Sequence, residues 1–225
     1  MRAAGAPDAA LAEAPRDDGL VVRALGRVGY AETFEAQKRF TATRDAATPD
    51  ELWLLQHPPV YTLGLAGKPE HLLESSDVPL VKIDRGGQIT YHGPGQAVVY
   101  LLIDLHRRNL KVRELVSLME QAMLDVLAAH GVAAARREGA PGVYAGEAKI
   151  GALGLKISRG CSYHGLSLNV DLDLAPFRRI NPCGYEGLRS TSLAEEGVTV
   201  TTDAVLAQLA LRLSELLARD HPRIA

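Results

Sequence analysis

The chain has little of three things that mark particular classes of protein: excess basic charge, long apolar runs and cysteine. Its formal net charge is −2 over 225 residues, so it lacks the positive field that draws proteins to the phosphate backbone of nucleic acids. The longest apolar run, residues 97–103, is far shorter than the roughly 20 residues of a membrane-spanning helix. The composition therefore argues against nucleic-acid and membrane partners.

The N-terminus and the cysteines bear on the compartment. Residues 1–19 have neither a basic start followed by an apolar stretch nor the cleavage-site pattern of a secretory signal. The two cysteines, Cys161 and Cys183, do not make the disulfide framework of a small secreted protein. In a reducing compartment a thiol is more often packed, bound to metal or catalytic. We therefore expect a cytoplasmic protein.

Composition also predicts the domain organisation. Residues 1–19 are rich in Ala, Pro, Asp and Arg and show no apolar periodicity, so they cannot repay the entropy of ordering and are predicted to form a flexible tail. The hydrophobic content of 47% is enough for one sizeable core. We expect residues 20–225 to form a single domain.

Apolar periodicity predicts three helices. A surface helix is expected over residues 30–44, and an amphipathic helix over 112–131 that ends at Gly131. The last helix is predicted to begin with Thr202 as its N-cap, and its leucines repeat at helical spacing. These stripes are typical of a core.

Strand signals alternate with these helices. Pro58 and Pro59 separate two extended pieces within residues 51–64, and residues 97–105 are apolar on both faces, as in a central strand. Between residues 142 and 174, Gly146 and Glu147 predict a two-residue hairpin turn.

The stretch "RGGQITYHGPGQ", residues 85–96, combines four glycines with Arg85, Tyr91 and His92 just ahead of the central strand. Glycines allow backbone N–H groups to approach a ligand closely. The stretch lacks a Gly-Lys-Ser/Thr ending and the dinucleotide fingerprint. It predicts a pocket wall rather than a phosphate cradle, and the alternative is a tight loop at the start of a strand.

Lys149 stands in the second unusual stretch, "GVYAGEAKIGALGLKISRG". In a continuous strand it points to the side of Leu153, Leu155 and Ile157, whereas Lys156 points to the other side. A lysine that shares a side with leucines is partly desolvated and is a candidate proton donor and acceptor. The alternative is a solvated lysine at a strand end.

The third stretch, residues 161–193, carries both cysteines. His164 alternates in phase with Leu166 and Leu168, so it is a candidate core histidine. Cys161, His164 and Cys183 lack the paired spacing of a zinc site, and no metal is predicted. Cys183 lies between Pro182 and Gly184 in a predicted turn.

Reactivity of the Cys183 thiol requires the thiolate form, and hence a nearby cation or base. Lys149 is the candidate for that group, although spacing alone leaves such a pair unproved.

The motifs "RGGQITYHGPGQ", "KIGALGLKISRG", "CSYHGLSLNVDLDL" and "INPCG" follow one another within residues 50–195. In order and wording they resemble the lipoyl(octanoyl) transferases of the lipoate-protein ligase B family. The resemblance implies an α/β (α+β) fold, a biotin/lipoate protein ligase-like catalytic domain with a mixed β-sheet packed with helices.

The resemblance also implies an activity. Such enzymes move an octanoyl group from octanoyl-acyl carrier protein to the ε-amine of a lysine on lipoyl domains, the first step of protein lipoylation. The acceptors implied are 2-oxoacid dehydrogenase complexes and the glycine cleavage H protein. Neither ATP nor a metal is expected as a cofactor.

Particular residues acquire roles by the same resemblance. Cys183 corresponds to the nucleophile that forms the acyl-thioester, and Lys149 to the residue that lowers the pKa of that thiol and moves protons. The substrate-binding residues implied are Arg85, Gly86, Gly87, Gln88, Ile89, Thr90, Tyr91, His92, Ala152, Leu153, Gly154, Gly165, Leu166 and Ser167.

Three alternative functions are considered beside this one. An ATP-dependent lipoate or biotin ligase on the same fold would need no thiol nucleophile, and a non-catalytic acyl-binding module would need neither Lys149 nor Cys183. A cysteine hydrolase is a weaker third, because water must be kept from the thioester. The presence of both residues favours the transferase.

Overall fold

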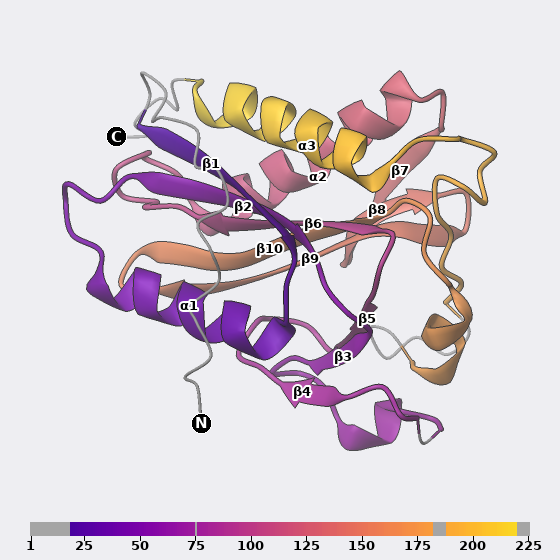
Figure 1. The fold of residues 1–225 in the computed structure, drawn as a ribbon. Coiled ribbons are helices and arrows are strands. Elements are labelled where there is room, and N and C mark those ends of the chain that lie inside the picture. The colour runs from indigo at the N-terminus through magenta and orange to yellow at the C-terminus, as the bar shows by residue number, and fades with distance from the viewer. Residues whose placement is uncertain (1–18, 75, 182–187, 220–225) are drawn as a thin grey trace.

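The computed structural model describes residues 19–74, 76–181 and 188–219 (Figure 1). The predicted flexible tail lies outside the described residues except for Gly19, and so does Cys183. The main element is a seven-stranded sheet whose strands are, in spatial order, β1 (Leu20–Arg27), β2 (Asp50–Gln56), β6 (Gln96–Leu102), β10 (Cys161–Asn169), β9 (Ala148–Ser158), β8 (Ala140–Ala145) and β7 (Ala134–Arg137).

The strands of this sheet are mostly antiparallel. Among the strand pairs of this sheet in the described part of the chain, only β1 and β2 run parallel to each other, which fits their connection through a helix. A smaller sheet beside it contains β4 (Leu80–Lys82), β3 (Val60–Leu63) and β5 (Ile89–His92). Two short 3₁₀ helices, η1 (Pro69–His71) and η2 (Ala175–Arg179), lie in the connections.

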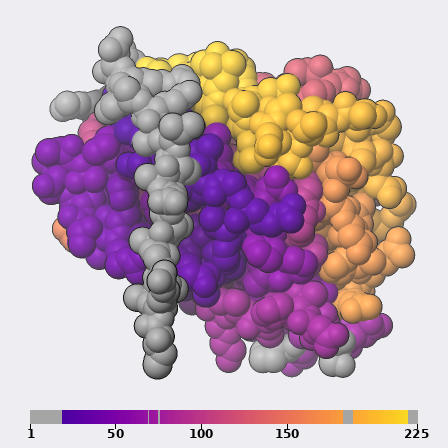
Figure 2. Space-filling model, in the orientation of Figure 1, coloured from indigo at the N-terminus to yellow at the C-terminus, as the bar shows by residue number. Residues whose placement is uncertain are grey.

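The α-helices cover both faces of the main sheet. Figure 1 shows α2 (Val112–Ala129) and α3 (Thr202–Leu217) on one face and α1 (Tyr30–Thr43) on the other. Helix α3 also contacts β2, and in Figure 2 its yellow surface lies beside the indigo and purple surface of the N-terminal elements. The predicted fold, a mixed sheet packed with helices, is confirmed.

The central strand β6 explains the two-faced apolar pattern of the sequence. Its residues Ala97, Val99 and Leu101 belong to the large core under α2 and α3. Its residues Val98 and Tyr100 belong to a second apolar cluster that includes side chains of α1. Since each face of β6 is covered by a helix, an apolar side chain is stable at every position.

Most predicted element boundaries are confirmed, with one correction. Helix α2 is followed by Gly131 in the left-handed region, at φ 76°, and β8 and β9 are joined by the predicted two-residue turn. The N-cap of α3 is Thr201 rather than Thr202, because it is the Thr201 hydroxyl that accepts a hydrogen bond from the N–H of Ala204. Among the described residues, no helix combines the length and apolarity needed to cross a membrane.

Candidate active site

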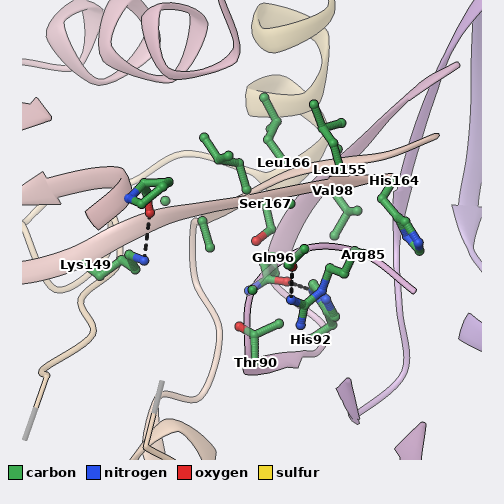
Figure 3. Close-up of a pocket in the computed structure, with 18 of the residues that line it drawn as sticks. Arg85, Thr90, His92, Gln96, Val98, Lys149, Leu155, His164, Leu166 and Ser167 are labelled. Carbon is green, nitrogen blue, oxygen red and sulfur yellow. Dashed lines mark hydrogen bonds between the residues drawn. The ribbon is translucent and has the colours of Figure 1, made fainter. Parts of the chain in front are cut away.

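A cavity of about 340 Å³ opens where the glycine-rich loop before β5 meets β6, β9 and β10 (Figure 3). A volume of this size lies within the range of small-ligand sites, about 300–1,000 Å³. All the substrate-binding residues expected from the motifs line it except Tyr91, and Lys149 lines it too. Other lining residues include Tyr30, Gln96, Val98, Tyr100, Ile150, Leu155, His164, Asn169 and Ser190.

Tyr91 does not line this cavity. Its ring packs in the core of the small sheet, with ring centroids 5.5 Å from those of Tyr61 and Phe177. Strand alternation in β5 turns Thr90 and His92 the other way. The glycine-rich motif therefore supplies both a wall of the cavity and part of a separate core.

The glycine-rich loop is docked onto β9 by its backbone. The N–H of Gly86 donates to the carbonyl oxygen of Leu155 at 3.0 Å. This close approach requires glycine at position 154, because a Cβ atom there would lie 2.9 Å from Cδ of Arg85 and 3.2 Å from the oxygen of Gly86. Arg85 in turn donates to both oxygens of Thr62, at 2.9 and 3.0 Å. Gly154 thus allows the loop to lie against β9.

A buried chain of hydrogen bonds runs along the wall of the cavity. His92 Nδ1 lies 2.7 Å from Gln96 Oε1, and Gln96 Nε2 donates to Asn169 Oδ1 at 2.9 Å. Asn169 Nδ2 donates to the carbonyl oxygen of Thr191 at 2.8 Å. The chain links the glycine-rich loop to the segment beside Lys149.

Sequence reasoning missed Gln96 and Asn169 as members of the site. A usable signal was present in each case, because a carboxamide in a strand whose neighbours are all buried must find hydrogen-bond partners inside the protein. Both side chains are nearly inaccessible. Tyr30 carried no such signal, since it reads as the first residue of a surface helix.

The strand that carries Lys149 contains a β-bulge. The register between β8 and β9 shifts after Gly151, so that Tyr144 pairs with Lys149 and Ile150 is the extra residue. The shift reverses the alternation of side chains. The placement of Lys149 on the side of Leu153 is therefore wrong, because the pairing puts Lys149 on the face of Tyr144 and Ala152.

The ammonium group of Lys149 is held at the end of the cavity. The residue is 8% exposed, and its Nζ donates to the carbonyl oxygen of Pro141 at 3.0 Å, as the dashed line in Figure 3 shows. Nζ also lies 5.3 Å from the ring centroid of Tyr144, within the range of a cation–π contact. Lys149 is thus a buried, hydrogen-bonded cation.

The backbone of Lys149 is paired with residues 189–191. Its N–H donates to Arg189 O at 2.8 Å, and its carbonyl oxygen accepts from the N–H of Thr191 at 3.0 Å. Ser190, between them, forms a parallel bridge with Lys149. The described chain that resumes after residues 182–187, the range that contains Cys183, is therefore tied directly to Lys149.

His164 departs from the predicted alternation. Its φ of 62° lies in the left-handed region, which turns the side chain away from the core of Leu166 and toward α1. The ring stacks on Phe34 with centroids 5.3 Å apart, and Nε2 lies 2.9 Å from Asp84 Oδ1. Tyr163 donates to the other oxygen of Asp84. His164 is a buried polar group of the cavity wall rather than part of the apolar core.

Burial determines the protonation of the histidines around the cavity. It lowers the pKa of His164 to about 4, against the opposing effect of Asp84, and lowers that of His57 to about 4. Burial and the nearby His57 lower the pKa of His92 to about 3. All three are neutral near pH 7.

Asp84 remains ionised beside them. Burial alone would raise the pKa of its carboxyl, but hydrogen bonds from Tyr163 and His164 outweigh burial and hold the pKa below its usual value. The neutral His164 therefore donates from Nε2. Its Nδ1 is a buried acceptor for which the described part of the chain offers no partner.

The fold and the cavity define an α+β domain with a cavity of small-ligand size whose lining includes a buried lysine. Residues 29–214 match the model of the lipoyl protein ligase A/B catalytic domain, and the chain belongs to this family. Two solved structures share the fold. A lipoate-protein ligase A bound with ATP superposes with a TM-score of 0.72 at 17% identity, over 91% of this chain and 87% of that chain. A biotin protein ligase from Aquifex aeolicus gives 0.53 at 15% identity, over 87% of this chain and 69% of that one.

Curated relatives narrow the class of enzyme within this family. The octanoyltransferase of Aromatoleum aromaticum is 62% identical over 93% of this chain and 92% of its own length. That of Dechloromonas aromatica is 60% identical over 89% of this chain and 98% of its own. The resemblance expected from the four motifs is confirmed, and so is the expected class of enzyme, an octanoyl-transferring acyltransferase.

Proposed function

We propose that the chain transfers an octanoyl group from octanoyl-acyl carrier protein to the ε-amine of a lysine on lipoyl domains, through a thioester on Cys183. The observation that carries the proposal is the position of Lys149. Its ammonium lies buried at one end of the cavity, and its backbone is paired with the segment that follows Cys183 in sequence. A cation there is suited to stabilise a thiolate at that end.

The first half-reaction exchanges one thioester for another. The ammonium of Lys149 stabilises the thiolate of Cys183, and this thiolate attacks the octanoyl carbonyl carbon. A sulfur–carbon bond to Cys183 forms and the bond to the carrier's sulfur breaks. Lys149 gives its proton to the departing sulfur and is left as the neutral amine. The product is octanoyl-Cys183.

The second half-reaction makes an amide. The ε-amine of the acceptor lysine attacks the thioester carbon, its proton passes to Lys149, and the Cys183 sulfur departs as a thiolate beside the recharged ammonium. No ATP or metal is part of the proposal, because the acyl group arrives activated as a thioester and leaves as a more stable amide.

The cavity supplies the means to hold the acyl chain. Val98, Leu155 and Leu166 are among the apolar side chains that line it. Burial of a methylene group stabilises the bound chain by ~0.8 kcal/mol. A chain that lies along β9 and β10 keeps its carbonyl end near Lys149.

The proposal includes partners and a compartment. The acceptors would be the lipoyl domains of 2-oxoacid dehydrogenase complexes and the glycine cleavage H protein, and the protein would work in the cytoplasm, where carrier-bound acyl groups and these acceptors meet. An incubation of the enzyme with each lipoyl domain and octanoyl-carrier protein tests the acceptors one at a time.

Intact-protein mass spectrometry tests the function itself. Wild-type enzyme mixed with octanoyl-acyl carrier protein, without ATP, is expected to gain the mass of one octanoyl group, and Cys183→Ala is expected to gain none. Addition of a lipoyl domain should move that mass to the domain. The control is Cys161→Ala, which removes a buried thiol that does not line the cavity and should acylate like the wild type.

The same experiment also tests the alternative function, an ATP-dependent ligase. If Cys183→Ala modified a lipoyl domain when given ATP and free octanoate, while no protein carried an octanoyl adduct, the thioester route would be wrong. The shared fold with lipoate-protein ligase A makes this the relevant comparison.

A further inference from the structure

A buried carboxylate lies one peptide group away from the ammonium of Lys149. Glu120 is on α2, is 8% exposed, and does not line the cavity. Its Oε1 accepts the backbone N–H of Gly142 at 3.0 Å. The carbonyl oxygen of Pro141, which belongs to the same peptide group, accepts the ammonium of Lys149 at 3.0 Å.

From Glu120 to Lys149 the groups therefore follow in the order carboxylate, peptide N–H, peptide C=O and ammonium. In a planar trans peptide the N–H and C=O point in opposite directions, so this peptide joins an anion on one side to a cation on the other. A hydrogen bond to an ionised group is stronger than one between neutral groups, and hydrogen bonds in a chain polarise one another. The negative charge of Glu120 thus strengthens the hydrogen bond that the carbonyl oxygen of Pro141 accepts from Lys149.

The two oxygens of Glu120 have different partners. Oε2 accepts from Nε of Arg136 at 3.0 Å, and Arg136 is fixed further by Gln121 and the carbonyl oxygen of Ser117. This arrangement orients the carboxylate and leaves Oε1 directed at Gly142. Arg136 compensates the charge from the outer side, where its own side chain is 39% exposed.

The position of Gly142 makes the contact close. Its φ is 127°, and a Cβ atom there would lie 2.7 Å from the oxygen of Gly151 and 2.9 Å from Cε of Lys149. Only glycine allows this backbone to lie against the lysine side chain. The peptide that carries the hydrogen bonds is thereby held against both β9 and Lys149.

We propose that Glu120 is a positioning residue for Lys149, acting through the peptide bond between Pro141 and Gly142. The inference rests on the proposed role of Lys149 in acyl transfer. Glu120 touches neither substrate nor the reacting atoms; it fixes where the ammonium of Lys149 lies.

The test compares Glu120→Gln with Asp125→Asn. Each change neutralises a carboxylate of α2 that pairs with an arginine, since Asp125 accepts from Arg212 at 2.6 Å, but only Glu120 reaches the peptide at Lys149. Glu120→Gln is expected to lower kcat for octanoyl transfer by on the order of 10- to 100-fold, because a misplacement of ~1 Å can cost about 10²-fold. The KM for octanoyl-carrier protein should stay unchanged. Asp125→Asn should retain the wild-type kcat.

A second readout does not depend on acyl transfer. Trace acetic anhydride at fixed pH labels uncharged amines, and peptide mass spectrometry measures the rate at Lys149 in the free enzyme. Glu120→Gln should label Lys149 severalfold faster than the wild type, because loss of the carboxylate weakens the hydrogen bond that holds the Lys149 amine at the carbonyl oxygen of Pro141. Asp125→Asn should label it at the wild-type rate.

The outcomes separate the inference from the proposed function. Unchanged labelling of Lys149 in Glu120→Gln would overturn the inference even if octanoyl transfer were normal. Faster labelling, confined to Glu120→Gln, would support it even if the thioester on Cys183 were never found. If Glu120→Gln failed to fold, Glu120→Asp, which keeps the charge but shortens the reach to Gly142, should give the same faster labelling.

Discussion

Gly154 lies so close to Arg85 that a Cβ atom on the glycine would meet Cδ of the arginine at 2.9 Å. The contact joins β9 to the glycine-rich loop that closes one side of the cavity. The loop occupies the space where a side chain at position 154 would lie. The shape of the cavity therefore depends on a residue with no side chain.

Replacing Gly154 by valine should therefore change which acyl chains are accepted. We expect the side chain to push the loop away from β9 and to occupy part of the cavity, so that hexanoyl is favoured relative to octanoyl. Loss of room for two methylene groups corresponds to about 1.6 kcal/mol, or roughly 15-fold in the ratio of kcat/KM values. The control is Ala135→Val on the exposed face of β7. An unchanged octanoyl-to-hexanoyl ratio would contradict the assignment of this cavity as the site that holds the acyl chain.

Replacing Lys149 by arginine should separate the two half-reactions. The guanidinium keeps a positive charge near the thiol but does not give up its proton near neutral pH. We expect octanoyl-Cys183 to form, though more slowly, and its transfer to a lipoyl domain to fall by about 10²-fold or more. Rapid-quench mass spectrometry measures the two steps. Lys156→Arg, on the same strand, is the control, and equal losses in both steps would contradict the expected separation of the two half-reactions.

Replacing Asn169 by leucine should destabilise the protein. The change leaves the Gln96 Nε2 donor and the Thr191 carbonyl oxygen buried without the partners they have now. Each such loss costs about 1–3 kcal/mol, so the free energy of unfolding should fall by about 2–4 kcal/mol. Urea denaturation measures it. Gln208→Leu, which removes a partly exposed hydrogen bond to His130, should cost much less; a similar loss in both variants would argue against a stabilising chain of hydrogen bonds in the cavity wall.

Stability should fall in mild acid because of the buried histidines. The pKa values of His57 and His164 are lowered to about 4 and that of His92 to about 3, whereas an unfolded chain protonates histidine near its ordinary value of about 6.5. Below that pH the unfolded state binds more protons, so the free energy of unfolding decreases by up to about 1.4 kcal/mol per pH unit for each histidine. Above about pH 7 these groups add no pH dependence.

Unfolding by urea at several pH values between 7 and 4 checks this expectation. The variant His57→Gln should flatten the pH dependence by the share of one histidine, whereas His106→Gln, at an exposed position, should leave it unchanged. If stability were constant down to the native pKa values, the histidines would have to be charged in the folded protein.

The helices, the two-faced central strand and the family were all readable from the sequence, since each depends on local pattern or on motif order. Periodicity places α2 and α3 because a helix or strand repeats its faces at a fixed interval. The glycine-rich stretch identified a wall of the cavity because glycine is needed wherever two backbones nearly touch.

The faces of Lys149 and His164 were decided only by the tertiary structure. One extra residue at Ile150 and one left-handed residue at His164 each reverse a strand's alternation, and no local pattern marks them. The partners of Lys149 likewise come from β8 and from residues 189–191. The sequence determined which side chains are available for chemistry, because side-chain type is local; the fold determined which of them meet, because a hydrogen bond between distant segments exists only after the chain has packed.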